Sequence, residues 1–191
     1  MTNKPQNWIE SADMTYCSSR LLFLRYNIFL WFDAAFLLHQ ALEKYAKALL
    51  LSKGKKRRGH NHSKLFGEII RFFPEFNTPY IKRLIDKLNK ILTIRYPDTP
   101  FSGEGIGQEE LMDADFLVRL IRERIPFTVT SEGIRKVVSY QLENYHKDLI
   151  QIILKDNNQR DYWEKELKGI NKDIDSFIEK LSGSKTSDNK G

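Results

Sequence analysis

The stretch from Asp33 to Gly54 limits what this chain can fold into more than any other part of it. It contains no proline, and its one glycine, Gly54, stands at its end, where glycine commonly stops a helix. On a helical wheel one side of the stretch is apolar, and leucines flank that side. The apolar side consists of Ala34, Leu38, Ala41, Leu42, Tyr45, Ala48 and Leu49, with Leu37, Leu50 and Leu51 on the flanks. A helix that is apolar on more than one side is the central helix of a bundle, or is shared with a second subunit.

The opposite side of this central helix is mixed. It carries Phe36, Gln40, Glu43 and Lys47. Glu43 precedes Lys47 by four residues, which is the order that favours an ion pair on a helix. We therefore expect a structural pair there, with a role in ligand binding as the alternative. His39 is expected to be a polar histidine of the core or of an interface.

Four further helices are predicted from apolar residues that recur every three or four positions. Their ranges are about 6–26, 65–73, 78–94 and 108–125. Asn27 is the turn-prone residue near the end of the first helix, so we place the break at 27–29. The only segment that alternates with a period of two, 126–130, is too short to change the fold class. The chain is therefore predicted to be all-α.

Turn-forming residues mark the ends of these helices. Ser63 is expected to cap the third helix, and Pro74 to stop it. Thr78 followed by Pro79 is a good start for the fourth helix, because a capping hydroxyl precedes a proline in the first turn. Pro126 ends the fifth. These ends place a helical bundle in residues 1–126.

The last third of the chain is predicted to form a separate helical hairpin in residues 127–182. Two segments, about 131–155 and 163–181, carry apolar residues spaced alternately four and three apart. Such matching seams, joined by a short polar turn, are typical of two antiparallel helices. Trp163 and Leu167 are expected to pack against Val138, Leu142 and Leu149. The final residues, 183–191, are expected to be a disordered tail.

Composition excludes several classes of protein. With 191 residues, 41% of them hydrophobic and 29% charged, the chain has the make-up of an ordinary globular protein. The longest apolar run, 21–38, is interrupted by Arg25, Asn27 and Asp33, so no membrane span is predicted. One cysteine, Cys17, cannot form an internal disulfide, which favours a cytoplasmic protein. The net charge of +6 is a modest excess that favours anionic partners.

Three sequence landmarks resemble one known family. The first is His39-Gln40-Ala41-Leu42-Glu43-Lys44 followed by Lys47-Ala48-Leu49-Leu50 in the central helix. The second is His62-Ser63, and the third is Arg95-Tyr96-Pro97-Asp98. In this order they resemble HEPN domains (higher eukaryote and prokaryote nucleotide-binding), over roughly residues 7 to 125. The resemblance implies an up-and-down helical bundle, and it marks five family-motif positions: His39, Gln40, Glu43, Lys44 and Lys47.

This resemblance implies a range of functions, because the family includes ribonucleases, nucleotide binders and inert partners. Its ribonucleases use an arginine followed, after four to six residues, by a histidine. Arg95 stands where that arginine would be, but the next histidine is His146. The chain therefore resembles a branch that carries the Arg-Tyr-Pro-Asp motif without the ribonuclease histidine. Arg57 and His62 match the spacing, but they lie in the loop after the central helix, which is the wrong part of the bundle.

A basic loop follows the central helix. Between Lys53 and Lys64 it carries six fixed positive charges: Lys53, Lys55, Lys56, Arg57, Arg58 and Lys64. It leads into the start of a helix, where free backbone N–H groups favour anions. One interpretation is a site for a phosphate of a nucleotide or RNA, and the other is a solvated loop that aids solubility. The ligand-binding candidates here are Lys55, Lys56, Arg57, Arg58 and His62. His60 and His62 lack a third nearby ligand, so no metal site is predicted.

Arg95 is a further candidate for ligand binding. It continues the apolar face of the fourth helix, and a buried guanidinium needs an acceptor. Asp98 is the expected partner, with a carboxylate or carbonyl from another helix as the competitor. The pair is either purely structural or the floor of an anion site.

From these features we expect a non-catalytic binding module without a cofactor. It would act as a homodimer on a nucleotide or RNA, or on a protein partner. The family resemblance implies that such a partner is a small nucleotidyltransferase, in a toxin–antitoxin or defence system. The alternative is a metal-independent ribonuclease, so enzymatic activity stays open, with the non-catalytic interpretation preferred.

Overall fold

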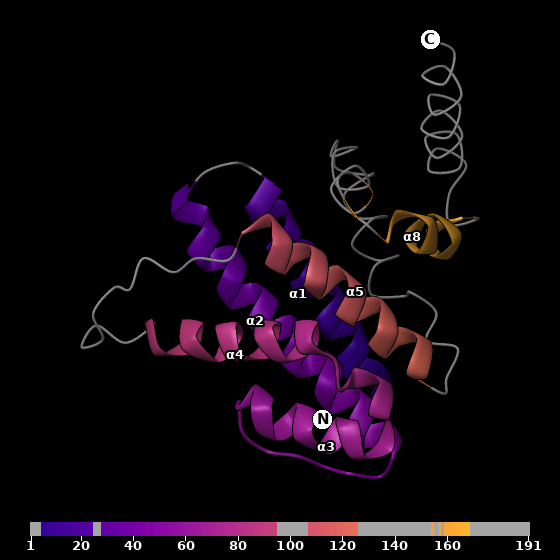
Figure 1. Ribbon diagram of the computed structural model, residues 1–191. Coiled ribbons are helices and arrows are strands. Elements are labelled where there is room, and N and C mark those ends of the chain that lie inside the picture. The colour runs from indigo at the N-terminus through magenta and orange to yellow at the C-terminus, as the bar shows by residue number, and fades with distance from the viewer. Residues whose placement is uncertain are drawn as a thin grey trace.

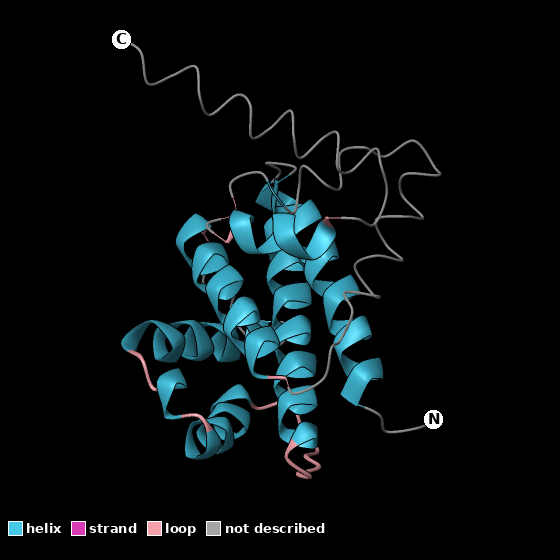
Figure 2. Cartoon of the chain, turned by 90° about the vertical axis from the view of Figure 1, so that its right-hand side faces the viewer, coloured by secondary structure: helices cyan, strands magenta, loops and turns pink. Residues whose placement is uncertain are grey.

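The computed structural model describes residues 5–24, 28–94 and 107–125, together with 154, 157 and 159–168 in the C-terminal third. Every regular element in these ranges is a helix, which confirms the predicted all-α class (Figure 2). None of the described helices is both long enough and apolar enough to cross a membrane. The elements are α1 (Pro5–Leu24), α2 (Ile28–Ser52), α3 (His62–Phe72), the short 3-10 helix η1 (Pro74–Phe76), α4 (Pro79–Ile94), α5 (Gln108–Arg124) and α8 (Arg160–Leu167).

Helix α2 is the central helix, as predicted. It packs against α1, α3, α4 and α5. Figure 1 shows α1, α2 and α5 running beside one another, with α3 and α4 crossing one end of them. All seven residues of its predicted apolar side are fully buried. The expected ion pair is also present, with Lys47 Nζ 2.6 Å from Glu43 Oε1, and both of its side chains are almost completely buried. The opposite side of α2 is therefore covered too.

The end of α2 is fixed by its glycine. Gly54 has a φ of 72°, a left-handed conformation that side chains disfavour. This turn lets the Lys55 N–H donate to Leu50 O and the Gly54 N–H donate to Leu51 O, both at 2.9 Å. The two bonds form a Schellman motif, which satisfies carbonyls that a helix end would otherwise leave unpaired. The predicted stop at Gly54 is confirmed.

The start of α3 differs from the prediction. The helix begins at His62 and its cap is Asn61, whose side-chain oxygen accepts from the Lys64 N–H at 2.9 Å. Ser63, the expected cap, lies inside the first turn and accepts from Asn89 Nδ2 at 2.7 Å. Asparagine and serine are about equally good caps, so the residue types alone did not separate the two positions. Thr78 does cap α4 as predicted, because its hydroxyl accepts from the Ile81 N–H at 3.2 Å.

Two reciprocal ion pairs connect α1 to α5. Asp13 pairs with Arg122, and Arg20 pairs with Asp115, so each helix contributes one acid and one arginine, seven residues apart. All four side chains are buried. Because the order of the pairs reverses between the helices, α1 and α5 are antiparallel. A slip of one residue would separate both pairs, so the pairs fix the register of the two helices.

Two buried tyrosines complete these pairs. The Tyr16 hydroxyl donates to Asp115, and the Tyr45 hydroxyl donates to Asp13. Burial raises the pKa of both hydroxyls well above the usual range, and the neighbouring carboxylates raise it further. Both hydroxyls therefore stay protonated as donors. Each buried carboxylate receives one tyrosine and one arginine, which offsets the cost of removing it from water.

Helix α8 covers one of the pairs with aromatic side chains. Trp163 is fully buried, and its ring stacks on Tyr16 with centroids 6.0 Å apart. The Arg122 guanidinium carbon lies 5.2 Å from the Trp163 ring centroid, and Arg122 Nε donates to the Tyr162 hydroxyl at 3.0 Å. Trp163, which we expected inside a separate hairpin, thus belongs to the core of the bundle.

The second arm of the predicted hairpin is not one continuous helix. Helix α8 ends at Leu167, and Lys168 has an extended backbone with a ψ of 135°. The helix that was predicted over 163–181 therefore ends at Leu167 within the described residues. Val138, Leu142 and Leu149, the rest of the hairpin and the tail at 183–191 lie outside the described residues.

Removing one partner of a buried ion pair tests the role of these pairs. Asp115→Ala is expected to lower the free energy of unfolding by about 3–5 kcal/mol, because the Arg20 guanidinium stays buried without its carboxylate. Replacing both residues, with Arg20→Met and Asp115→Leu, is expected to recover much of this loss. Chemical denaturation followed by circular dichroism measures all variants. Glu123→Ala is the control, since it breaks the exposed pair with Arg119 and is expected to cost about 0.5 kcal/mol or less. If the Asp115→Ala protein were as stable as the Glu123→Ala protein, Asp115 and Arg20 would not form a buried ion pair that the fold depends on.

Candidate functional site

The loop between α2 and α3, residues 53–61, is held at both of its ends. The Schellman motif at Gly54 fixes one end, and the Asn61 cap fixes the other. Within the loop, Gly59 has a φ of 98°, and a Cβ there would meet nothing within 4 Å. The glycine is thus required by backbone conformation and not by crowding. The loop itself is exposed, so its charged side chains face solvent from a restrained backbone.

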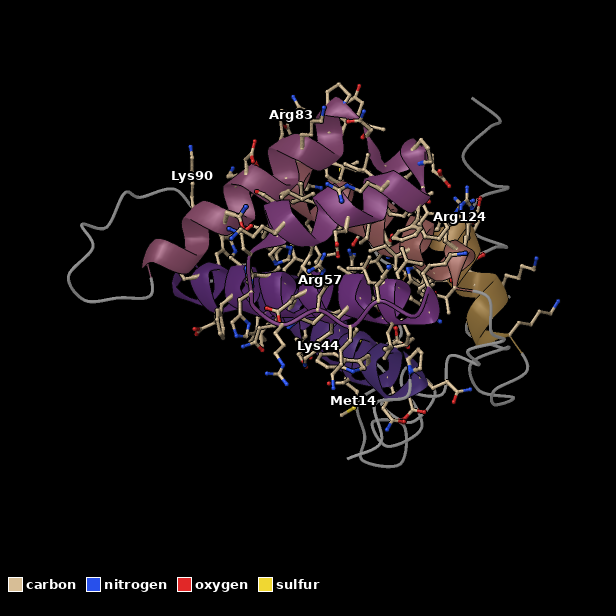
Figure 3. All side chains as sticks on the ribbon, turned by 90° about the horizontal axis from the view of Figure 1, so that it is seen from below. Met14, Lys44, Arg57, Arg83, Lys90 and Arg124 are labelled. Atoms are coloured by element: carbon tan, nitrogen blue, oxygen red, sulfur yellow. The ribbon has the colours of Figure 1, made fainter. Side chains whose placement is uncertain are left out.

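A hollow of about 530 Å³ lies between this loop and α3. Its lining includes four cationic side chains: Arg57, Arg58, Lys64 and Arg71. Glu68 is the one acidic residue among the lining residues, and it forms an ion pair with Arg57. Figure 3 shows Arg57 on the side of the molecule where the loop passes α3. The hollow therefore gathers three more positive charges than negative ones.

The start of α3 contributes less to this hollow than the sequence suggested. The His62 N–H donates to Asn89 Oδ1 at 3.2 Å, and the Lys64 N–H donates to Asn61 Oδ1. These two backbone donors are already used, so neither is open to a ligand. An anion in the hollow would instead meet side-chain cations, assisted by the helix dipole.

The predicted loop residues separate into two groups. Arg57 and Arg58 line the hollow, whereas Lys55 and Lys56 are exposed residues that do not line it. Arg71 also lines the hollow, although it was not among the residues predicted to bind a ligand. A signal for it exists, because Lys64, Glu68 and Arg71 follow the helical spacing of four and three on one face of α3.

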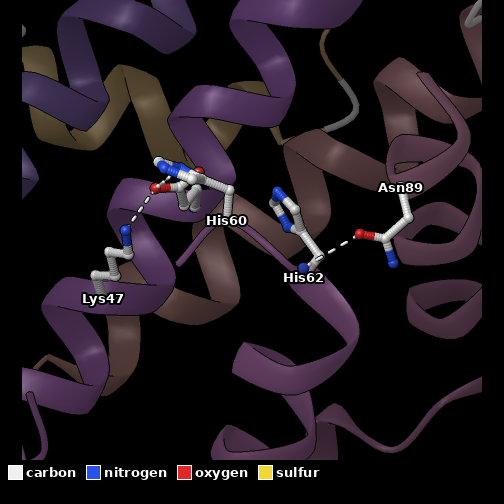
Figure 4. A network of polar contacts seen from close by, with 5 residues as sticks. Lys47, His60, His62 and Asn89 are labelled. Atoms are coloured by element: carbon white, nitrogen blue, oxygen red, sulfur yellow. Dashed lines mark hydrogen bonds and ion pairs between the residues drawn. The ribbon is translucent and has the colours of Figure 1, made fainter. Parts of the chain in front are cut away.

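His60 is held against α2 by a carboxylate. Its Nδ1 lies 3.0 Å from Glu43 Oε1 and 2.9 Å from Oε2, and Lys47 donates to the same carboxylate (Figure 4). The His60 side chain is 76% exposed while the Glu43 side chain is only 10% exposed. A neutral imidazole that donates from Nδ1 presents its other nitrogen, Nε2, as an acceptor. The ion pair predicted at Glu43 and Lys47 thus also orients a histidine at the surface.

His39 and His62 form a second, buried histidine unit. Both rings are buried, with centroids 4.0 Å apart in an edge-to-face arrangement, and none of their four ring nitrogens has a hydrogen-bond partner among the described residues. Burial lowers the pKa of His39 to about 4 and that of His62 to about 3. His39 is therefore a core histidine, as expected. His62, a predicted ligand-binding residue, faces the core and does not line the hollow.

The other candidates from the sequence are structural or lie elsewhere. Lys44 Nζ donates to Thr15 Oγ1 at 2.6 Å, which ties α2 to α1, and Gln40 is half-buried on α2. Arg95 and Asp98 lie outside the described residues, so their expected pair remains a prediction. Within the described part of the chain, no three His, Cys, Asp or Glu side chains converge as metal ligands.

The buried histidines make stability depend on pH. Both rings are neutral in the folded protein, but the unfolded chain protonates them near the ordinary pKa of 6.5. As the pH falls from 6.5 towards 4, each ring is therefore expected to lower the free energy of unfolding by about 1.4 kcal/mol per pH unit. Below its folded pKa the effect levels off, and above pH 6.5 it is absent. Glu43, Lys47 and His60 are the charged or titratable groups around the two rings.

His62→Leu removes one of these rings. The loss of stability between pH 7 and pH 5 is expected to be smaller in this variant by roughly 2 kcal/mol. Urea denaturation at the two pH values measures it, and a comparison between pH 7 and pH 8, where neither ring titrates, serves as the control. An identical acid loss in both proteins would show that His62 is not buried as a neutral ring.

Three comparisons with known proteins were made, and one of them gives a match. No curated protein and no solved structure matches the chain. The family model described as the HEPN domain matches residues 5–125, which span α1 to the end of α5 and well over half of the chain. The matched region contains the central helix, the basic loop and both histidine units. The chain therefore belongs to the HEPN domain family.

Proposed function

We propose that this HEPN-domain protein binds phosphate groups of RNA or of a nucleotide in the hollow between the α2–α3 loop and α3. The observation that carries the proposal is the convergence of Arg57, Arg58, Lys64 and Arg71 on one concave surface. Arginine presents a planar fork of donors that matches two phosphate oxygens, and lysine adds a point charge. Membership of a nucleotide- and RNA-related family supports the same ligand chemistry.

Recognition at this hollow depends on charge and not on base sequence. No aromatic side chain is among its lining residues, so bases have no stacking platform there. The arginines and the lysine reach phosphate oxygens, which carry no sequence information directly. The ligand is therefore held by its phosphates, and affinity falls as salt rises.

The remaining parts of the proposal concern partners. The homodimer, the nucleotidyltransferase partner and a role in toxin–antitoxin or defence systems rest on the family resemblance. Met112 and Phe116, exposed one turn apart on α5, are apolar side chains available to a protein partner. The expectation of a binding module without catalysis is kept as the first candidate.

Two double variants of equal charge test the hollow. Arg58→Ser with Arg71→Ser removes two cations that line it, while Lys55→Ser with Lys56→Ser removes two loop cations that do not. The first variant is expected to weaken binding of a 5′-phosphorylated oligoribonucleotide by about tenfold or more, because charge-assisted hydrogen bonds are lost. The second is expected to change it only a few-fold through the general field. Fluorescence anisotropy at 50 and 200 mM salt measures both.

These two variants distinguish a built site from diffuse attraction. Equal losses in both would mean that the positive charge of the whole loop attracts RNA without a site. If the parent protein did not bind the oligoribonucleotide at all, the proposed phosphate binding would be wrong. In the parent, affinity is expected to fall steeply with salt. In the Arg58→Ser, Arg71→Ser variant, the slope of log affinity against log salt concentration is expected to be smaller in magnitude by about 1.4, because two phosphate contacts on a single strand are lost.

A metal-independent ribonuclease is the second candidate, favoured by the Glu43–His60 contact. In such cleavage the ribose 2′-oxygen bonds to phosphorus, the bond from phosphorus to the 5′-oxygen breaks, and a 2′,3′-cyclic phosphate forms. His60 Nε2 would accept the 2′-hydroxyl proton, the leaving 5′-oxygen would take a proton from water, and Glu43 would stabilise the protonated ring. Arg57 and Arg58, next to His60 in the loop, would supply positive charge to the phosphate.

Cleavage of labelled RNA in EDTA decides between the two candidates. If His60 is the base, the parent protein produces cyclic phosphate ends, and His60→Ala lowers the rate by about 10²–10⁴-fold while RNA binding persists. If the protein is a binding module only, the parent leaves the RNA intact. Cleavage that survives in the His60→Ala protein would place the base at another residue.

A further inference from the structure

A glycine, Gly67, lies in the middle of α3 and lines the hollow. Apart from proline, glycine is the least favourable residue in a helix interior, because its backbone loses the most conformational freedom on folding. Among the described glycines, positive φ angles occur at Gly54 and Gly59, whereas Gly67 has the conformation of the helix around it. An alanine would adopt that conformation more readily. Backbone geometry therefore does not explain why a glycine stands here.

Crowding does not explain this glycine either. In the described part of the chain, a Cβ built at Gly67 would meet nothing within 4 Å beyond its chain neighbours and the backbone of its own helix. The side of α3 that packs on the bundle carries Leu65, Phe66 and Ile69, which are buried, while Gly67 is exposed. The missing side chain thus leaves an open gap above the α3 backbone, on the side of the helix that faces the hollow.

This gap lies between two cations of the hollow. Lys64 precedes Gly67 by three residues and Arg71 follows it by four, so the three positions share one face of α3. Lys64 and Arg71 are about 10.5 Å apart along the helix axis, at 1.5 Å per residue. Side chains on a helix lean towards its N-terminus, which directs Arg71 back over the turn that contains Gly67. An anion that contacts both cations therefore lies above Gly67.

The surroundings of the gap favour an anion of nucleotide size. Glu68, the acidic neighbour on the same face, forms an ion pair with Arg57, so a loop arginine compensates its charge. Lys64, Arg71 and Arg58 then leave the lining positive. The hollow of about 530 Å³ falls within the range of roughly 300–1,000 Å³ that is typical of small-ligand sites. A phosphate above Gly67 therefore has cations on both sides, with room beside it for a sugar.

We propose that Gly67 is the seat of the bound phosphate. Because this position has no side chain, a phosphate group of RNA or of a nucleotide approaches the α3 backbone closely enough to contact Lys64 and Arg71 at once. The proposal rests on the phosphate-binding function proposed above and names the place in the hollow where the phosphate lies. Gly67 acts as a positioning residue, and the helix stability that it sacrifices is the consequence of keeping the seat open.

Two substitutions that leave the charge of the full-length protein unchanged test the seat. Gly67→Ala is expected to raise Tm by about 1–4 °C, because alanine is the better helix former and has room. It is nevertheless expected to weaken binding of the 5′-phosphorylated oligoribonucleotide. Gly67→Leu fills the seat and is expected to weaken this binding by about tenfold or more, because charge-assisted hydrogen bonds to the phosphate are lost.

Ser18→Leu is the matched control, since it places the same side chain at an exposed position of α1 that does not line the hollow. It is expected to leave binding unchanged. Fluorescence anisotropy measures the affinities, and thermal unfolding followed by circular dichroism measures Tm. A purely structural role of Gly67 would change stability and binding in the same direction, whereas a seat for phosphate predicts a more stable alanine variant that binds less well.

The outcomes separate this inference from the function on which it rests. If the parent protein does not bind the oligoribonucleotide, the phosphate-binding function itself fails. If the parent binds and Arg58→Ser with Arg71→Ser weakens binding, but Gly67→Leu binds as tightly as Ser18→Leu, the function holds and the seat is elsewhere in the hollow. A lower Tm for Gly67→Ala than for the parent also overturns the inference, because the fold itself would then need the glycine.

Discussion

The two buried pairs between α1 and α5 set the frame on which the rest of the molecule depends. Asp13 with Arg122 and Arg20 with Asp115 hold the two helices antiparallel in one register, and neither pair survives a slip. Burying four charges is costly, and the cost is offset here because each carboxylate accepts from a tyrosine hydroxyl as well as from its arginine. Trp163 of α8 then packs on Tyr16 and Arg122 and covers these pairs. We infer that these pairs serve mainly to fix the register of α1 against α5, because the cost of burying the charges offsets much of their attraction.

This frame matters for function because α2 lies within it and carries the loop. Helix α2 is buried on nearly all sides, so its end at Gly54 is a fixed point. At the other end of the loop, Asn61 and Asn89 hold the first turn of α3, while His62 anchors it in the core. The loop therefore projects its arginines from two rigid ends. The loop backbone therefore loses little conformational entropy when a ligand binds, which favours affinity for even a small anion.

Much of the fold was predictable from residue patterns, because helix periodicity and turn residues are local signals. The ranges of α4 and α5, the C-terminal end of α2 and the caps at Gly54 and Thr78 follow from them, whereas α2 begins at Ile28, inside the predicted break at 27–29. The ion pairs between α1 and α5 were not predicted. A charged residue on a helix is ordinarily expected to be exposed, and each of these residues has its partner about a hundred residues away in the sequence. The contacts of Trp163 with Tyr16 and Arg122 were not predicted either, because a heptad-like spacing does not say which surface a residue covers. At the site, the loop charges were visible, but which of them share a hollow with Arg71 and Glu68 depends on the path of the backbone.

Backbone amide chemical shifts can locate a phosphate that binds in the hollow beside α3. The full-length protein, labelled with ¹⁵N, is titrated with a nucleoside 5′-monophosphate and, separately, with the nucleoside lacking the phosphate. We expect the monophosphate to shift amides in 57–71, around Arg58, Lys64 and Arg71, and the nucleoside to leave them in place. Shifts confined to α1 and α5, or equal shifts with both compounds, would contradict this expectation.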